Sequence, residues 1–320
     1  MYHSQQSVDG YWEESVMAKV AEGYMAFGES RTYWCMVGER TKKLPLLTLH
    51  GGPGAAHDYL TSLDDLAADG RQVIYYDQYG CGRSPAPSQD HWTPELFLEE
   101  LKALRKHLNL ECFHLLGQSW GGMLAIRFAH TRPRGLTGLV LASSPVSVQQ
   151  WNDESACLLS GMPDDQRGAL IMGEATGRRN TREYLEALSL FNARHICRMK
   201  TIPKFVLRSL HQIGEVFYSM RGGSGLKLGG VLTNVDLTPL LPAIDVPTLV
   251  TAGRFDQCTP KVVRTLLGGI TGSRSFILEN SGHLAHVEER ETYNKALETF
   301  LAEAEMNIDD KITGGSVSKS

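Results

Sequence analysis

The chain has 320 residues, a formal net charge of −4 and 42% hydrophobic residues, so it is long enough to bury a large core as one α/β domain, with or without an insertion. The negative charge and the scattered basic residues give no electrostatic basis for nucleic-acid binding. Residues 1–10 lack the apolar run of a secretory signal, and no stretch reaches the roughly 20 apolar residues of a membrane span. We therefore expect a cytoplasmic protein that is not bound to a membrane.

The cysteines fit neither a zinc site nor a disulfide framework. None of the six belongs to a C-x-x-C pair, and their spacing is irregular. We expect a reduced protein that needs no metal or organic cofactor. The six are Cys35, Cys81, Cys112, Cys157, Cys197 and Cys258.

Strands and helices alternate along most of the chain, which predicts a mostly parallel central sheet covered by helices on both faces. An opening pair of strands is expected first, and the later strands are short apolar runs. Leucines at helical spacing precede the third of these runs, and an amphipathic helix ends the pattern. The expected strands cover 23–37, 44–49, 72–76, 112–116, 136–142, 246–252 and 275–278, and the expected helices 96–108 and 293–304.

Residues 145–237 break this alternation, with helical stretches at 164–171, 181–196 and 204–218 and no strand pattern. We interpret them as a helical cap inserted into a core formed by residues 1–144 and 238–305. A cap at the carboxyl ends of the strands would cover the place where open α/β sheets bind ligands. The alternative is surface decoration without a role in binding. Residues 306–320 are expected to form a disordered tail.

Residues 115–122 have the sequence LLGQSWGG, in which Ser119 stands between an apolar strand end and the start of an apolar helix. This G-x-S-x-G context is typical of a nucleophile elbow, where glycines on either side allow a sharp, strained turn. The Trp120 N–H, at the positive end of the new helix, would face a developing oxyanion. A simple Gly/Ser turn without chemistry is the alternative.

A serine nucleophile needs a base and an acid that orients the base. Asp256 and His283 follow the two last predicted strands, in the order serine, acid, histidine that elbow hydrolases use. Asp245 precedes its strand and so lies at the wrong end of the sheet, and His286 is a weaker rival for the base.

The second oxyanion donor is expected in the loop HGGPG at residues 50–54, which follows an early strand. Its glycines let the backbone approach a tetrahedral intermediate, and the Gly52 N–H is the candidate partner of the Trp120 N–H. A Gly/Pro turn without this role is the alternative.

These motifs together resemble the proline iminopeptidases, most strongly the tricorn-associated branch. The similar segments are HGGPG, HDYL at residues 57–60, DQYGCGRS at 77–84, GQSWGG at 117–122, GRFDQ at 253–257 and SGH at 281–283. The resemblance covers nearly the whole chain and implies an α/β-hydrolase fold with a helical cap and a triad of Ser119, Asp256 and His283. It also implies that residues 77–84 form a structural turn.

Two positions depart from the family pattern that implies recognition of a substrate α-amine. The family has a glutamate directly after the catalytic aspartate, where this chain has Gln257, and another in a cap motif resembling M-x-G-x-x-E-F, where it has Gly225. A buried ammonium needs opposite charge, and neither residue supplies it. Another acid such as Glu215 could substitute.

The sequence thus predicts a serine hydrolase that acts through an acyl-enzyme on a small molecule or short peptide. One hypothesis is cleavage of an amide or peptide bond after an N-terminal residue such as proline. The second is hydrolysis of an ester, lactone or amide of an uncharged small molecule, for example in specialised metabolism. A catalytically idle binding protein is the third, and the oligomeric state is left open.

Overall fold

A computed structural model describes residues 19–87 and 92–314. Its centre is an eight-stranded sheet with the order β1-β2-β4-β3-β5-β6-β7-β8. β1 and β2 join the sheet antiparallel, and the neighbours from β4 to β8 are parallel. The strands are β1 (Lys19–Phe27), β2 (Ser30–Val37), β3 (Leu46–Leu49), β4 (Val73–Tyr76), β5 (Phe113–Gln118), β6 (Leu136–Ala142), β7 (Thr248–Gly253) and β8 (Arg274–Leu278).

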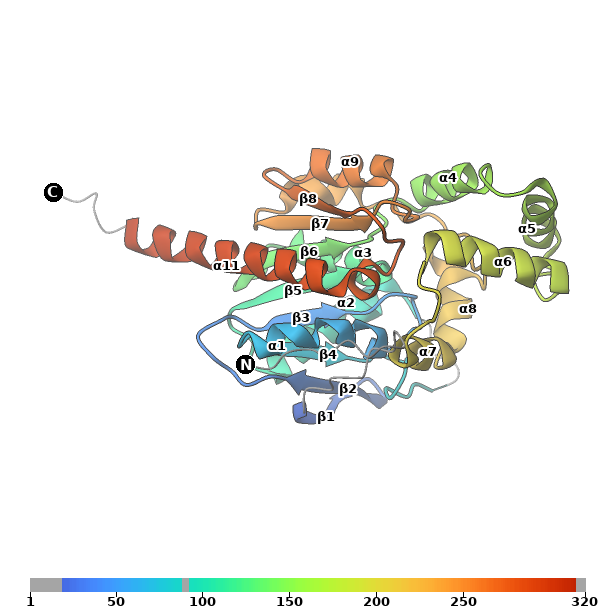
Figure 1. The fold of residues 1–320 in the computed structure, drawn as a ribbon. Coiled ribbons are helices and arrows are strands. Elements are labelled where there is room, and N and C mark those ends of the chain that lie inside the picture. The colour runs from blue at the N-terminus through green and yellow to red at the C-terminus, as the bar shows by residue number, and fades with distance from the viewer. Residues whose placement is uncertain (1–18, 88–91, 315–320) are drawn as a thin grey trace, which may run out of the picture.

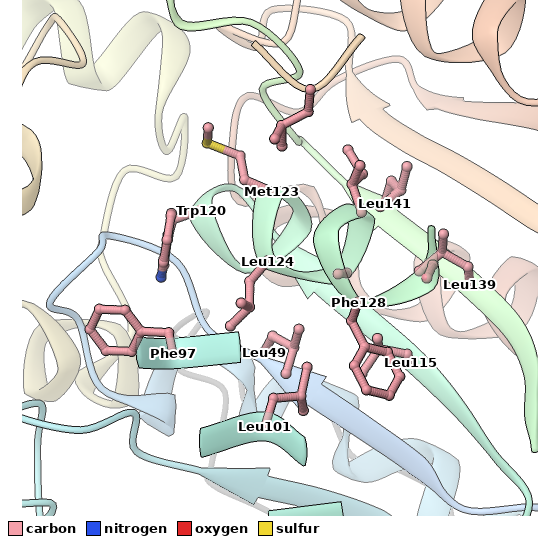
Figure 2. Packing of buried hydrophobic residues seen from close by; sticks show 14 of the residues in the cluster. Leu49, Phe97, Leu101, Leu115, Trp120, Met123, Leu124, Phe128, Leu139 and Leu141 are labelled. Atoms are coloured by element: carbon pink, nitrogen blue, oxygen red, sulfur yellow. The ribbon is translucent and has the colours of Figure 1, made fainter. Parts of the chain in front are cut away.

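The inner strands β3, β5, β6 and β7 are buried at every position, as expected for parallel strands covered on both faces. On one face, α2 (Pro94–His107), α3 (Trp120–Ala129) and α9 (Pro260–Gly269) contribute to one apolar cluster with the sheet. Figure 2 shows part of this cluster, in which the ring of Phe97 lies beside that of Trp120. On the other face, η1 (His57–Asp64), α1 (Asp65–Ala68) and α11 (Arg290–Gly314) form a second cluster. Burial on both faces fixes the strand ends that carry the site.

Between β6 and β7 the chain forms five α-helices, all within its described part, and these lie together to one side of the sheet (Figure 1). The two ends of this insertion meet in a single bridge between Ser147 and Asp236. Two short 3-10 segments, η2 (Gly230–Leu232) and η3 (Thr238–Ala243), lead back to the core. The five helices are α4 (Val148–Leu159), α5 (Asp164–Thr176), α6 (Arg182–His195), α7 (Lys204–His211) and α8 (Glu215–Arg221). The exact cap bounds of 145–237 stay a prediction.

The expected tail needs a correction. Helix α11 continues to Gly314, so the predicted disorder is wrong for residues 306–314. Residues 315–320 lie outside the described part. The absence of proline from residues 290–314 lets the helix continue. Glu305 also anchors it, because its carboxylate accepts hydrogen bonds from Arg71 at 2.5 Å and lies 2.9 Å from the His114 ring.

Candidate active site

Ser119 lies at the turn between β5 and α3 with a left-handed backbone, φ 55° and ψ −118°. Such a conformation is strained for a residue with a side chain. The flanking glycines are required by space. A Cβ on Gly117 would lie 2.2 Å from the Gly121 carbonyl oxygen, and one on Gly121 would lie 2.1 Å from the Leu49 carbonyl oxygen. The turn therefore forms only with glycine at both positions.

The candidate acid and base meet beyond β7 and β8. His283 Nδ1 lies 2.7 Å from Asp256 Oδ1, and both residues are buried. The same Asp256 oxygen accepts the backbone N–H of Cys258 at 2.9 Å. An ionised carboxylate in this position fixes the imidazole tautomer with its proton on Nδ1, which leaves Nε2 as the basic nitrogen.

The two rivals lie in different surroundings. Asp245 has a half-exposed side chain, 3.5 Å from Arg132. His286 is buried between the rings of Tyr59 and Tyr293, with centroid distances of 5.6 and 5.9 Å. Burial, and secondly the field of His283, lowers the pKa of His286 to about 3. A neutral histidine between two aromatic rings has a packing role.

Gln118 connects the elbow to the two other loops of the site. Its Nε2 donates to the His283 carbonyl at 3.2 Å, and its Oε1 accepts from the Tyr59 hydroxyl at 2.6 Å. The same hydroxyl accepts the Gly51 N–H at 2.6 Å. The sequence predicted no role for Gln118 or Tyr59, although the segments that resemble the family include both. Gln118 occupies the unspecified position of G-x-S-x-G, and the partner of Tyr59 lies 59 residues away.

The loop at residues 50–54 lies against Ser119: a Cβ on Gly51 would lie 3.0 Å from Ser119 Cβ. His50 Nε2 accepts the Gln78 N–H at 2.9 Å, so the ring proton is on Nδ1, which donates to the Gly51 carbonyl at 3.0 Å. That carbonyl and the Gly52 N–H belong to one peptide unit. His50 therefore orients the peptide that carries the candidate oxyanion donor, and burial lowers its pKa to about 4, which keeps it neutral.

The second candidate donor lies at the start of α3. Trp120 is the first residue of this helix, where a backbone N–H has no intrahelical acceptor. Its indole donates to Gln78 Oε1 at 2.8 Å, and Gln78 Nε2 donates to the His50 carbonyl at 2.8 Å. One glutamine thus joins the two segments that carry the Gly52 and Trp120 amides.

The end of α6 in the cap holds both loops of the acid and the base. The backbone N–H groups of His283 and Leu284 donate to the carbonyls of His195 and Ile196, each at 3.0 Å. The His195 ring, through Nδ1, lies 2.8 Å from the carbonyl of Phe255, the residue before Asp256. The relative position of acid and base therefore depends on the cap.

The two positions that depart from the family pattern are both filled by other contacts. Gln257 is 1% exposed, and its Nε2 donates to Ser155 Oγ on α4 at 3.4 Å. A Cβ on Gly225 would lie 2.9 Å from Leu188 Cδ2 on α6. Glu215, the possible substitute acid, lies exposed in the first turn of α8.

Residues 77–84 form a turn around Asp77. One carboxylate oxygen accepts the backbone N–H of His57 at 2.8 Å and lies 2.7 Å from its Nδ1; the other accepts the Arg83 N–H at 2.9 Å. Within the described residues all six cysteines are free, and no cluster of three or more His, Cys, Asp or Glu side chains is arranged to hold a metal. No helix of that part has the length and apolarity needed to cross a bilayer.

The fold agrees with the family comparison. Residues 45–290, about three quarters of the chain, match the family of the α/β hydrolase fold. The protein is an α/β hydrolase, as the sequence predicted.

Relatives and solved structures indicate which family of α/β hydrolases the chain resembles. The proline iminopeptidase of Lactobacillus helveticus is 40% identical over 289 residues, which cover 88% of this chain and 98% of that protein. The proline iminopeptidase of Clostridium botulinum is 38% identical over 288 residues, with the same two coverages. Among solved structures, VinJ has a TM-score of 0.87 at 36% identity, and the proline iminopeptidase of Mycobacterium smegmatis 0.85 at 34%; each alignment covers 90% of this chain and 100% of the other. The chain belongs to the proline iminopeptidase family and is a serine hydrolase.

Proposed function

We propose that Ser119 is the nucleophile, that His283 takes its proton and that Asp256 orients His283. The observation that carries this proposal is the 2.7 Å contact between His283 Nδ1 and Asp256 Oδ1 beside a strained serine turn. Ser119 Oγ attacks the substrate carbonyl, and the Gly52 and Trp120 amides donate to the resulting oxyanion. His283 then protonates the leaving group, and water activated by the same residue releases the acyl group from Ser119.

The bond cleaved is an amide or peptide bond, with an N-terminal residue such as proline as the acyl group. The names of the relatives at 38–40% identity support this choice. The substrate is a short peptide or small molecule, the expected location is the cytoplasm, and the mechanism uses only groups of the chain.

A second candidate is hydrolysis of an ester, lactone or amide whose acyl group carries no amine. The observation that favours it is the chemistry of the two altered positions. Gln257 is neutral and bonded to Ser155, and Leu188 fills the space next to Gly225. Loss of a desolvated charge partner costs on the order of a few kcal/mol, enough to remove most discrimination for an ammonium.

Labelling with an alkyl fluorophosphonate tests the nucleophile. We expect the wild-type protein to be labelled and the Ser119→Ala variant to be neither labelled nor active. A folded wild-type protein that resists the reagent would support an idle binding protein instead. Turnover of proline 4-nitroanilide and of an aryl ester without an amine then separates the two candidates: efficient cleavage of the anilide supports the peptidase, and cleavage of the ester alone supports the second.

A further inference from the structure

Arg221, the last residue of α8, joins the cap to the loop that carries the candidate oxyanion donor. Its Nε donates to the Ser224 carbonyl at 2.8 Å, and its Nη2 donates to the Gly225 carbonyl at 3.2 Å. Its Nη1 donates to the Gly52 carbonyl, also at 3.2 Å. One guanidinium thus bridges Gly52 and Gly225, which come from opposite sides of the interface between cap and core.

Among the residues that the structure describes, no carboxylate is paired with Arg221 alone. The carboxylate whose field acts on it is that of Glu174 on α5, and this carboxylate already accepts from Arg179 Nε and Nη2 at 3.2 and 3.1 Å. Two guanidinium groups share one carboxylate, so the cluster carries one net positive charge. Burial lowers the pKa of Arg221 to about 10 against the field of Glu174, and the group stays protonated at neutral pH.

This charge lies close enough to the nucleophile to act on a bound acyl group. Arg221 Nη1 touches the Gly52 carbonyl, and the Cβ position of the preceding Gly51 lies 3.0 Å from Ser119 Cβ. With the covalent lengths between them, the guanidinium is at most roughly 14 Å from Ser119 Cβ. At that distance and an effective dielectric constant near 20, a unit charge changes the affinity for a charged group by about fivefold or more.

We propose that Arg221 determines the charge specificity of the site: it favours an acyl group that ends in an oxygen acceptor, above all a carboxylate, and disfavours one that ends in an ammonium. The neutral side chain of Gln257 and the apolar Leu188 beside Gly225 leave this cation without a competing acid at the two altered positions. The proposal rests on the proposed acyl transfer to Ser119. It specifies the substrate class of that reaction in favour of the second candidate, an acyl group without an amine, over an N-terminal residue with a free amine.

Three alkyl fluorophosphonates of equal chain length, ending in a carboxylate, a methyl or an ammonium group, test this inference by their rates of inactivation. We expect the carboxylate reagent to react at least about fivefold faster than the methyl reagent, and the ammonium reagent to be slower by a similar factor. Equal rates, or a preference for the ammonium reagent, would overturn the inference. Labelling by none of the three would instead overturn the proposed nucleophile, so the two failures are distinguishable.

Two variants separate charge from positioning. Arg221→Gln removes the charge, and we expect the three rates to converge. Arg221→Lys keeps the charge but loses the fork that spans Gly52 and Gly225, so all rates fall while their order remains. An unchanged order in Arg221→Gln would contradict the proposal. If that variant does not fold, the wild-type order and the lysine variant decide the question.

Discussion

His50 offers a test of how the oxyanion loop is held, because its two ring nitrogens have separate partners. Nδ1 donates to the Gly51 carbonyl and Nε2 accepts from the Gln78 N–H. An asparagine places its amide nitrogen near the position of Nδ1, and a glutamine places its carbonyl oxygen near that of Nε2. His50→Asn therefore keeps the bond that orients the Gly51–Gly52 peptide, and His50→Gln keeps only the bond to Gln78.

The two variants are expected to have similar stability and different activity. Each leaves one buried backbone group without a partner, which costs about 1–3 kcal/mol and lowers Tm by roughly 2–5 °C for a chain of this size. Complete loss of one oxyanion donor lowers kcat on the order of 10²–10³-fold, and a misoriented donor is expected to cost less. We therefore expect kcat to fall about 10- to 100-fold in His50→Gln and less than about threefold in His50→Asn.

The assay measures kcat on an activated aryl ester together with thermal unfolding of both variants. Comparable Tm values make the comparison of kcat meaningful, because each variant is then the folding control of the other. Equal losses of kcat in the two variants would refute the role of the His50 bond in orienting the Gly52 N–H. Full activity in His50→Gln would refute it as well.

Three further predictions concern the elbow, the core and the acid. Gly121→Ala should abolish soluble, active protein because its Cβ would lie 2.1 Å from the Leu49 carbonyl, whereas Gly268→Ala on α9 meets nothing within 4 Å and should leave Tm unchanged or higher. Burial, and to a smaller extent the charge of Asp77, raises the pKa of Glu100 from 4.5 to about 8. Because the fold favours the neutral form of Glu100, the free energy of unfolding should fall as pH rises from 4.5 through 8, by at most about 5 kcal/mol. The Glu100→Gln variant should show a flatter dependence of Tm on pH over that range. Asp256→Asn should lower kcat about 10³- to 10⁴-fold through the wrong His283 tautomer with little change in Tm, and a loss below tenfold would contradict its role.

The strands could be predicted because burial on both faces leaves a local record in the sequence. The run at 136–142 coincides with β6, and the runs at 44–49 and 246–252 differ from β3 and β7 only at their ends. The segment His57–Asp64 was missed since it has no apolar period. Its polar residues are buried by contacts made far along the chain, such as the one between His57 and Asp77.

The candidate site likewise contains residues that the sequence predicted and residues that it did not. Ser119, Asp256 and His283 have signals in the order of motifs and strands. Gln118, His195 and Arg221 have none, because each acts through a backbone carbonyl or a side chain at least 59 residues away. A carbonyl acceptor places no requirement on the residue type that carries it, so no pattern in the partner reveals the contact.

Under the proposed role of Arg221, the cap combines substrate selection with the geometry of the core loops, and this limits how specificity can be changed. A glutamate at residue 225 begins 2.9 Å from Leu188 Cδ2 and needs that side chain to move. Its carboxylate would also meet the guanidinium of Arg221, which is bonded to the carbonyl of residue 225 itself. An internal ion pair would form before any substrate ammonium arrived, and it would pull Arg221 from Gly52. Restoring a carboxylate alone is thus expected to lower activity, and recognition of an amine requires replacing Arg221 and Leu188 together with Gly225.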